Sequence, residues 1–246
     1  MKIVINQKYR DLKSFVESVP DIFASSGKTV YKARNELKSF SIDGYNIIVK
    51  RYKKPHKINQ IAYTFIRPSK AKRAYEYALR LLQLGVESPA PIAYIEQYKD
   101  GLFTFGYFIS IYETDYSVIR ELMAGTQEDE QLLNELSVYI AQLHSKGVLH
   151  LDMSPGNILY KKIENNFHFT LIDINRMQFL PTISKEKRFK SFKRLSDNPE
   201  VLTKIGKIYA ATSNLDELET IEKIKLYSSQ FFSSKKRFKI RKYKES

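Results

Sequence analysis

The chain has 246 residues, of which 43% are hydrophobic, so it is long enough for one two-lobed domain or two small ones and too apolar to be disordered throughout. It contains no cysteine, which excludes disulfides, cysteine metal sites and cysteine nucleophiles and favours a reducing compartment. The formal net charge of +14 favours an anionic partner, such as nucleic acid, an acidic membrane surface or a polyanionic substrate; lysine that merely solvates the surface is the alternative.

The sequence shows no signal for export or for membrane insertion. Residues 1–8 lack the apolar stretch of a secretory signal. The longest apolar-rich run, residues 103–111, is far shorter than the ~20 residues that span a bilayer. We therefore expect a cytoplasmic protein that is soluble or peripheral to a membrane.

The first half of the chain is typical of a β-rich region. Strands are expected over residues 29–32, 36–40 and 45–52, because β-branched and aromatic residues concentrate there. An amphipathic helix is expected over residues 70–84, where apolar side chains recur at helical spacing until Gly85. Strands over residues 92–97 and 102–112 follow, joined by a hairpin turn at residues 99–101. This pattern predicts a five-stranded sheet with one helix.

The second half is expected to be mostly helical. Helices are predicted over residues 117–124, over residues 128–146 and from Pro199 to the end, and Gly147 is expected to end the second of them. A short hairpin is predicted at residues 158–161 and 167–172. The predicted fold class is α+β: two lobes with a cleft between them, a β-rich N-lobe with one helix and a small, mostly helical C-lobe. The predicted boundaries are residues 1–113, 114–230 and a tail of 231–246.

The run from His150 to Asn157 fits the pattern H-x-D-x-x-x-x-N, which is typical of catalytic loops in protein-kinase-like enzymes. It lies between a predicted helix and a predicted hairpin, and Asp173 follows that hairpin. The amide oxygen of Asn157 and the carboxylate of Asp173 suit Mg²⁺, while Asp152 accepts the proton of the acceptor hydroxyl or only orients that hydroxyl. The alternative is that Asp152 and Asn157 are turn and cap residues.

The run Ile-Ile-Val-Lys that ends at Lys50 resembles V-A-I-K, in which the lysine contacts the α- and β-phosphates of ATP. Glu76 is the only carboxylate in the helix predicted over residues 70–84, so an ion pair between Lys50 and Glu76 is expected. The alternatives are an ordinary lysine on an edge strand and a solvated glutamate.

The glycine-rich loop of such enzymes has no counterpart here, because the turn at residues 33–35 contains no glycine. Asn35 tolerates the left-handed conformation that a tight turn demands. Backbone N–H groups and the guanidinium of Arg34 then cover the phosphates, or the segment is a plain hairpin turn. The adenine is expected to contact the backbone near Tyr112, Glu113 and Thr114.

Together these residues resemble the protein-kinase-like superfamily and, more narrowly, the bacterial lipopolysaccharide core kinases that phosphorylate Kdo or heptose sugars. The resemblance covers roughly residues 28–215. The narrower match rests on Ser69-Lys70-Ala71-Lys72-Arg73-Ala74-Tyr75-Glu76, Gly85-Val86-Glu87-Ser88-Pro89-Ala90-Pro91-Ile92, His150-Leu151-Asp152 and Asp173-Ile174-Asn175-Arg176. The resemblance implies ATP and Mg²⁺ as cofactors, an anionic, lipid-linked sugar as acceptor, and work at the cytoplasmic face of the inner membrane.

Three departures from the protein-kinase pattern narrow the function. Leu151 replaces the arginine of H-R-D, which argues against activation gated by phosphorylation. The run from Asp173 to Asn175 lacks the Phe and Gly of D-F-G, and no A-P-E follows. These departures favour a compact small-molecule or glycolipid kinase over a regulated protein kinase.

Residues 235–246 contain seven basic residues and one acidic residue, and aromatic residues interleave with them. Each basic residue near an anionic leaflet contributes about 1 kcal/mol of binding. A peripheral membrane contact is therefore expected; nucleic-acid binding, which we favour less, and a solvated tail are the alternatives.

We interpret the chain as a kinase that phosphorylates a sugar hydroxyl of the lipopolysaccharide inner core. An atypical protein Ser/Thr kinase is one competing interpretation. A nucleotide-binding pseudokinase that binds RNA or acts as a scaffold through its basic surface is another. The sequence leaves the acceptor sugar, the number of metal ions and the oligomeric state open.

Overall fold

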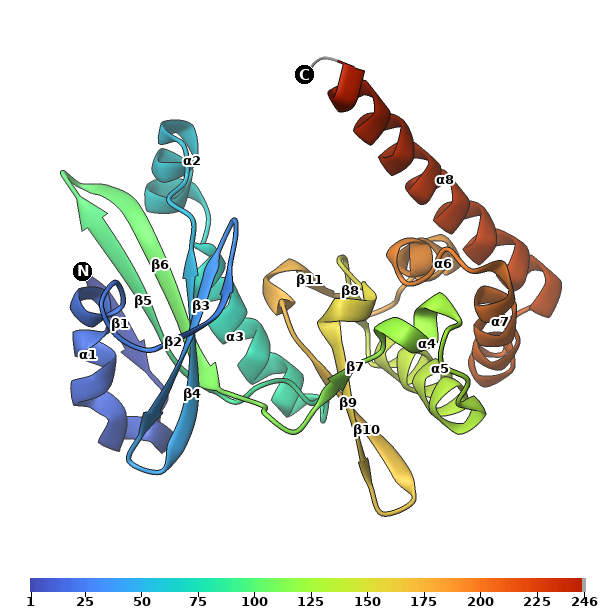
Figure 1. The fold of residues 1–246 in the computed structure, drawn as a ribbon, viewed down its shortest axis with the longest axis horizontal. Helices are drawn as coiled ribbons and strands as arrows, with labels where there is room; N and C mark the ends of the chain where they lie inside the picture. The colour runs from blue at the N-terminus through green and yellow to red at the C-terminus, as the bar shows by residue number, and fades with distance from the viewer. Residues whose placement is uncertain (245–246) are drawn as a thin grey trace. The chain divides into compact units, whose positions relative to one another are not determined.

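The structure, a computed structural model, describes the backbone of residues 1–244 and the side chains of residues 1–237. The chain forms two compact units, Met1–Thr114 and Asp115–Ser246, which Figure 1 shows in blue to green and in green to red. Each unit has its own sheets and helices.

The first unit is built on a six-stranded antiparallel sheet in the order β1-β5-β6-β4-β3-β2. The prediction of five strands is wrong, because β1 pairs with β5 as an added edge strand. With only four residues, β1 is too short to show an alternating pattern. The strands are β1 (Lys2–Ile5), β2 (Lys28–Lys32), β3 (Glu36–Ile42), β4 (Tyr45–Tyr52), β5 (Pro91–Lys99) and β6 (Leu102–Ile111).

The first unit also contains more than the one predicted helix. The helices are a 3₁₀ segment η1 (Gln7–Leu12), α1 (Lys13–Ile22), α2 (Lys57–Ile61), a π-helical turn η2 (Ala62–Ile66) and α3 (Lys70–Gln83). Pro20 lies inside α1. Because proline is unfavourable in the interior of a helix, the sequence pattern does not indicate this helix. The helix over residues 70–84 is confirmed as α3, with Ser69 as its N-cap.

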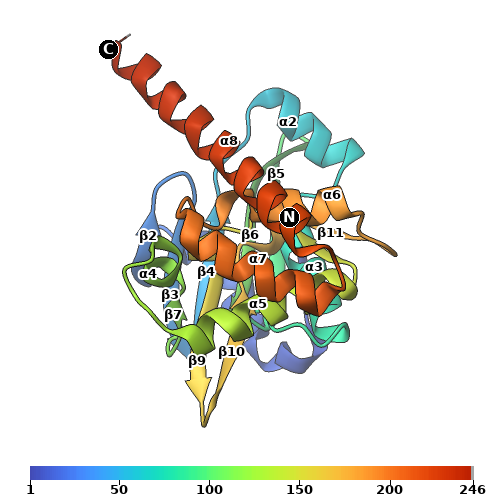
Figure 2. The ribbon, with the colours of Figure 1, turned by 90° about the vertical axis from the view of Figure 1, so that its right-hand side faces the viewer.

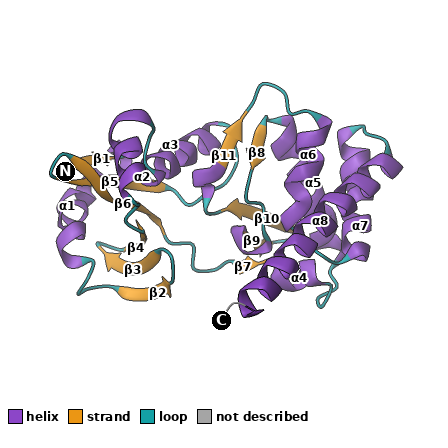
Figure 3. Cartoon of the chain, turned by 90° about the horizontal axis from the view of Figure 1, so that it is seen from above, coloured by secondary structure: helices purple, strands orange, loops and turns teal. Residues whose placement is uncertain are grey.

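Helices α1 and α3 cover opposite faces of this sheet (Figures 1 and 3). The side chains of Phe15, Val16 and Val19 on α1 pack in one core with Ile47 and Val49 of β4. On the other face, the rings of Tyr75 on α3 and Tyr94 on β5 lie 5.3 Å apart. Residues of β4 that point away from Ile47 and Val49 therefore lie on the face that α3 covers.

Two turns test the sequence-based expectations directly. The hairpin turn between β5 and β6 is confirmed, because Lys99 pairs with Leu102 and both Asp100 and Gly101 have positive φ. The left-handed conformation expected for Asn35 is wrong. Among the described residues, the non-glycine residues with positive φ are Asp43, Asp100, Glu164, Asp173 and Asn214.

The second unit is mostly helical, as predicted, and its described residues also form one three-stranded and one two-stranded sheet. The helices are α4 (Arg120–Ala124), α5 (Glu130–Ser145), α6 (Lys185–Ser191), α7 (Pro199–Ser213), α8 (Glu217–Lys244) and the 3₁₀ segments η3 (Pro155–Asn157), η4 (Ile174–Arg176) and η5 (Phe192–Arg194). The strands are β7 (Ser117–Val118), β8 (Val148–His150), β9 (Ile158–Ile163), β10 (Asn166–Leu171) and β11 (Met177–Phe179). Figure 2 shows α7 beside both α5 and α8.

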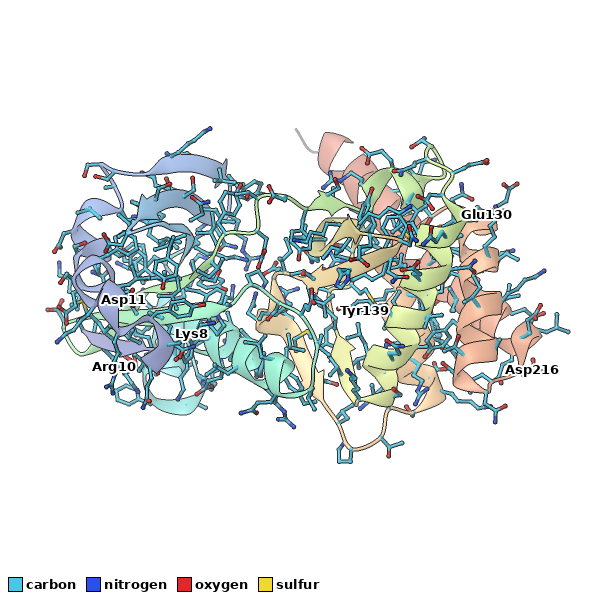
Figure 4. All side chains as sticks on the ribbon, turned by 90° about the horizontal axis from the view of Figure 1, so that it is seen from below. Lys8, Arg10, Asp11, Glu130, Tyr139 and Asp216 are labelled. Atoms are coloured by element: carbon cyan, nitrogen blue, oxygen red, sulfur yellow. The ribbon has the colours of Figure 1, made fainter. Side chains whose placement is uncertain are left out.

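The second unit corrects two details of the prediction and confirms a third. The helix expected over residues 117–124 begins as strand β7, which pairs with β9. Strands β8 and β11 pair with each other and were not expected. The hairpin of β9 and β10 is confirmed. It is held against α5 by Tyr139, which is labelled in Figure 4. The ring of Tyr139 stacks on that of Phe169 with the centroids 5.0 Å apart.

Gly147 connects α5 to β8 with a left-handed backbone, φ +72°. Its carbonyl accepts a hydrogen bond from the N–H of Leu180 at 2.9 Å. A Cβ atom at this position would lie 1.9 Å from the carbonyl oxygen of Leu180, so the close approach requires glycine. The predicted end of the long helix at Gly147 is thus confirmed, and the same residue fixes where β8 starts.

Helix α8 continues through Lys244, so the expected tail is helical over its described backbone. Residues 245 and 246, and the side chains from Phe238 onward that carry much of the predicted basic charge, lie outside the described residues. Within the part of the chain that is described, none of the helices is both long enough and apolar enough to cross a membrane.

Candidate active site

The predicted catalytic residues fall in two sets, one in each unit. The second unit holds Asp152, Asn157 and Asp173, and the first unit holds the residues predicted to bind the nucleotide: Lys50, Glu76, Arg34, Asn35 and Glu113. Each set is therefore positioned by the helices and strands of its own unit.

His150, the last residue of β8, holds the loop that follows it. Its buried ring donates from Nε2 to the carbonyl of Ile172 at 3.2 Å, and Nδ1 accepts from the N–H of Asp152 at 3.0 Å. These partners require a neutral ring, and burial lowers the pKa of His150 in the same direction. The imidazole therefore fixes the backbone of Asp152 and does not take part in proton transfer.

Two arginines hold the carboxylate of Asp152. The Nη1 atom of Arg194, on η5, lies 2.7 Å from Asp152 Oδ1, and Nη1 of Arg176, on η4, lies 3.5 Å from Oδ2. The Asp152 side chain is only 14% exposed, so these pairs are partly screened from water. The direction of the carboxylate is thus set by residues outside its own loop.

Arg194 is in turn supported from α8. Its guanidinium carbon lies 5.2 Å from the centroid of the Phe231 ring, within the range of a cation–π contact. The position of the carboxylate of Asp152 thus depends on a side chain nearly 80 residues further along the chain.

Asn157 closes the loop with its side chain. Its Nδ2 donates to the carbonyl of Asp152 at 2.8 Å, and its own carbonyl accepts from the N–H of Ile172 at 3.0 Å. Because the amide nitrogen is engaged inside the loop, the remaining polar atom of the side chain, Oδ1, is an acceptor. Asn157 therefore offers an oxygen ligand beside the segment that leads into Asp173.

Asp173 follows β10 in a left-handed conformation, φ +53° and ψ +41°. Such a backbone is uncommon for a residue with a Cβ atom and is found most often at functional sites. The Nδ2 of the buried Asn175 donates to Asp173 Oδ1 at 2.6 Å, which orients the carboxylate. The N–H of Leu151 also donates to the carbonyl of Arg176 at 3.0 Å, so the two segments that carry Asp152 and Asp173 are tied together.

These oxygen atoms fit a magnesium ion. Mg²⁺ usually takes one or two protein oxygen ligands and completes its shell with water and substrate phosphate. The carboxylate of Asp173 and the amide oxygen of Asn157 are such a set. Groups of three or more His, Asp or Glu side chains that could hold a metal do not occur among the described residues.

In the first unit, Lys50 lies on the face of the sheet that α3 covers. Lys50 follows Val49, whose side chain lies in the core on the α1 face, so the side chain of Lys50 points to the other face. Its cross-strand neighbour on β6 is Phe108, and Phe108 pairs in turn with Tyr94 on β5. The Nζ atom of Lys50 lies 5.3 Å from the ring centroid of Tyr52. Lys50 is therefore on the same side of the sheet as the helix that carries Glu76.

Glu76 has a different partner from the predicted one. Its carboxylate lies 3.7 Å from Nζ of Lys72, one turn away on α3, and the pair is largely exposed. Burial first, and then the charges of Glu96 and Glu76, raise the pKa of Tyr94 to about 12. The pair of Lys50 and Glu76 stays a prediction.

The other residues predicted to contact the nucleotide, Arg34, Asn35 and Glu113, lie in the first unit and stay predictions. The Oδ1 atom of Asn35 accepts from the N–H of Lys53 at 3.3 Å, which makes Asn35 a brace for its turn, while Arg34 is exposed. The N–H of Tyr112 is taken by the carbonyl of Asn46 at 2.8 Å, and Glu113 is half-buried. Tyr112 therefore cannot donate to an adenine in this conformation.

Sequence reasoning missed the arginines that hold Asp152. Arg194 ends a basic run of residues 185–194, and nothing in its spacing separates it from its neighbours. Arg176 is the last residue of one run on which the family resemblance rests, but the sequence pattern indicates no function for its side chain. Only the fold, which places η4 and η5 beside the loop, identifies the two residues.

Comparisons with known proteins identify the family and the fold of the chain. Residues 42–206 match the model of the lipopolysaccharide kinase (Kdo/WaaP) family. The EKC/KEOPS complex subunit BUD32 of Encephalitozoon cuniculi (strain GB-M1) is 22% identical over 120 residues, 49% of this chain and 55% of that protein, so the chain spans about half the length of this curated relative. The solved structure "WaaP in complex with acyl carrier protein" aligns with a TM-score of 0.64 at 16% identity, over 94% of this chain and 100% of that chain.

The structural match confirms the protein-kinase-like fold, and the matched family region includes both the His150–Asn157 loop and Lys50. That region is more than half of the chain. The chain therefore belongs to the lipopolysaccharide kinase (Kdo/WaaP) family.

Proposed function

We propose that the chain transfers the γ-phosphoryl group of ATP to a hydroxyl of Kdo or heptose in the lipopolysaccharide inner core. The observation that carries this proposal is the carboxylate of Asp152, held by Arg194 and Arg176 at the end of a strand. Membership of the family supports a lipopolysaccharide core acceptor, and the choice between Kdo and heptose is left to the experiment below.

Asp152 acts on the acceptor hydroxyl. Its carboxylate accepts the hydrogen bond of that hydroxyl and aims the oxygen at the γ-phosphorus. As the new O–P bond forms, the bond between the γ-phosphorus and the β,γ-bridging oxygen breaks, ADP leaves, and the proton of the hydroxyl passes to Asp152 or to water. Because the transition state of phosphoryl transfer is loose, orientation contributes more than strong basicity. A carboxylate held in place by two guanidinium groups suits this role, since its direction is fixed.

The remaining predicted residues act on the nucleotide. Asn157 and Asp173 hold Mg²⁺, which when bound neutralises the charge of the phosphates. Lys50 contacts the α- and β-phosphates, and Glu76 orients the side chain of Lys50. Arg34 and the backbone at Asn35 cover the phosphates. Backbone groups at Glu113 meet the adenine.

The acceptor places the reaction at a membrane surface. An anionic glycolipid lies in the inner membrane and ATP lies in the cytoplasm, so we infer work at the inner face of that membrane. The basic tail, whose described part includes the exposed Lys235, Lys236 and Arg237, supplies a peripheral contact with anionic lipid.

One set of incubations tests the proposal. The protein, [γ-³²P]ATP and Mg²⁺ are combined in parallel with Kdo-lipid A, heptosylated Kdo-lipid A, a generic protein substrate and RNA. We expect label in glycolipid only, and its loss in Asp152→Asn with the affinity for ATP retained. Label in the protein substrate instead would support an atypical protein kinase. Binding of ATP or RNA without transfer to any acceptor would support a pseudokinase.

A further inference from the structure

A ridge of exposed apolar side chains stands on the segment between β4 and α3. It is formed by Ile58 and Ile61 on α2 and by Phe65 and Ile66 on η2, which are 82%, 47%, 74% and 79% exposed. Four large apolar side chains among the described residues are more than 70% exposed, and three of them belong to this ridge. Exposed apolar groups that gather in this way mark interaction surfaces.

The four residues lie on one side of the segment by their spacing. Positions 58, 61, 65 and 66 follow the i, i+3, i+7, i+8 pattern of one helix face. The turn η2 is closed by a hydrogen bond from the N–H of Arg67 to the carbonyl of Ala62, the i→i+5 pattern of a π-turn. Such turns are frequent at functional sites.

The opposite side of the segment is fastened to the sheet. The Oγ1 atom of Thr64 accepts from the N–H of Phe103 at 2.9 Å, and the rings of Tyr63 and Phe103 pack edge to face at 5.4 Å (the segment lies beside β6 in Figure 1). Gln60 donates to the carbonyl of Pro55 at 2.9 Å. The ridge is therefore exposed because of how the segment is docked, and not because the segment is loosely held.

The charges around the ridge have one sign. Lys53, Lys54, Lys57 and Arg67 are all exposed and flank the ridge on both sides in the sequence. No acidic residue occurs anywhere from residue 44 to residue 75. An apolar face whose charged neighbours in the sequence are all cations matches the two layers of an anionic membrane surface, with acyl chains for the apolar groups and headgroup phosphates for the cations.

We propose that the α2–η2 ridge is a membrane-docking element that inserts Ile58, Phe65 and Ile66 into the interface of an anionic bilayer while the flanking lysines contact lipid phosphates. This site is in the first unit and is independent of the basic tail on α8. It also does not require the proposed kinase activity, so binding to vesicles tests it without any measurement of turnover.

The absence of tryptophan from the chain allows a direct test. Phe65→Trp places a single fluorophore on the ridge, and Leu218→Trp is a matched control at an exposed position, 71%, on α8. Each variant is titrated with vesicles of phosphatidylglycerol and phosphatidylcholine that include brominated phosphatidylcholine as quencher, and with vesicles of phosphatidylcholine alone. We expect a blue shift and quenching of the fluorescence of Phe65→Trp with the anionic vesicles only, and little change in the fluorescence of Leu218→Trp.

A second test measures binding by co-sedimentation of the full chain with the same vesicles. We expect Ile58→Ser/Phe65→Ser/Ile66→Ser to lower the vesicle partition coefficient by at least about tenfold, because most of the inserted apolar surface is gone. Lys53→Gln/Lys54→Gln/Lys57→Gln should lower it and weaken its dependence on salt. Leu218→Ser serves as the control for loss of an exposed apolar side chain and should bind as the unchanged chain does.

Each other outcome overturns the proposal. Vesicle binding by Phe65→Trp without quenching of its fluorescence would assign the contact to another surface such as the tail. If the triple serine variant bound vesicles as strongly as the unchanged chain does, the contact would also be assigned to another surface. A blue shift of the fluorescence of Phe65→Trp with a purified protein and not with vesicles would make the ridge a protein-docking surface.

Discussion

The guanidinium of Arg194 lies 2.7 Å from the carboxylate of Asp152, although the two residues are separated by strands β9, β10 and β11 in the sequence. Loops are the most mobile parts of most folds, and a catalytic carboxylate on a loop needs an external support. Here η5, which is packed on α8, supplies that support through one charged contact.

We predict that Arg194 is a positioning residue. Arg194→Gln should lower kcat by roughly 10- to 100-fold with little change in the KM for ATP, because the misplaced Asp152 affects only the acceptor. Arg194→Lys should recover part of the loss, since it keeps the charge and loses the planar geometry. Lys193→Gln removes the same charge from the exposed neighbour and serves as control. A rise in the KM for ATP at unchanged kcat would contradict this role.

Asp173→Asn should abolish turnover while the fold survives. Asparagine tolerates the left-handed backbone of this position and its Oδ1 can still accept from Asn175, so the change removes little but the negative charge. We expect a loss of about 10³-fold or more in kcat and an unchanged thermal midpoint. Steady-state kinetics over a Mg²⁺ titration, with circular dichroism as the folding control, measure both. Near-normal turnover would remove Asp173 from the metal site.

The predicted contact between Lys50 and Glu76 can be measured by a double-mutant cycle. Lys50→Met, Glu76→Gln and the double variant are compared for their affinity for a non-hydrolysable ATP analogue. If the pair forms with nucleotide bound, the coupling should be about 0.5–3 kcal/mol. Lys72→Gln, which removes only the partner observed for Glu76, should leave the affinity close to normal. Additive losses from Lys50→Met and Glu76→Gln would show that the two side chains act separately.

The stability of the protein should fall between pH 7 and pH 5 because of His144. Burial, and then the charge of Arg188, lower the pKa of His144 from 6.5 to about 3. Below pH 6.5 the unfolded chain therefore binds a proton that the folded chain rejects, so the free energy of unfolding falls as the pH falls toward 3. The slope is about 1.4 kcal/mol per pH unit, or roughly 2 kcal/mol between pH 6.5 and pH 5.

Urea unfolding of the unchanged chain and of His144→Gln at pH 7 and pH 5 measures this contribution. Glutamine does not titrate and can keep a hydrogen bond to the hydroxyl of Tyr209, which lies 2.7 Å from His144 Nδ1. The variant should lose less stability than the unchanged chain over the same interval. Parallel losses in the two proteins would assign the pH dependence to other groups, such as the buried His150.

Local patterns predicted the parts of the fold that depend on few neighbours. The helix at α3 and the Asp100-Gly101 turn follow from apolar periodicity and from turn chemistry, which are properties of short segments. The kinase loop was recognisable because its residues are close in sequence. Strand β1 and helix α1 were missed, since β1 depends on its pairing with β5, and the core that holds α1 overrides the effect of Pro20. Arg194 was missed for the same kind of reason, because its role is defined only by tertiary contact.

The ring of Phe231 under Arg194 has a practical consequence for shortened forms of the protein. The family match ends at residue 206, inside α7, and Phe231 lies beyond it on α8. A fragment cut to the family boundaries, or one that stops at residue 230, keeps every residue of the candidate catalytic loop and loses the side chain that steadies its arginine. The smallest recombinant form worth expressing for assays therefore ends after Phe231, and a soluble but inactive shorter fragment would say nothing against the assignment of Asp152.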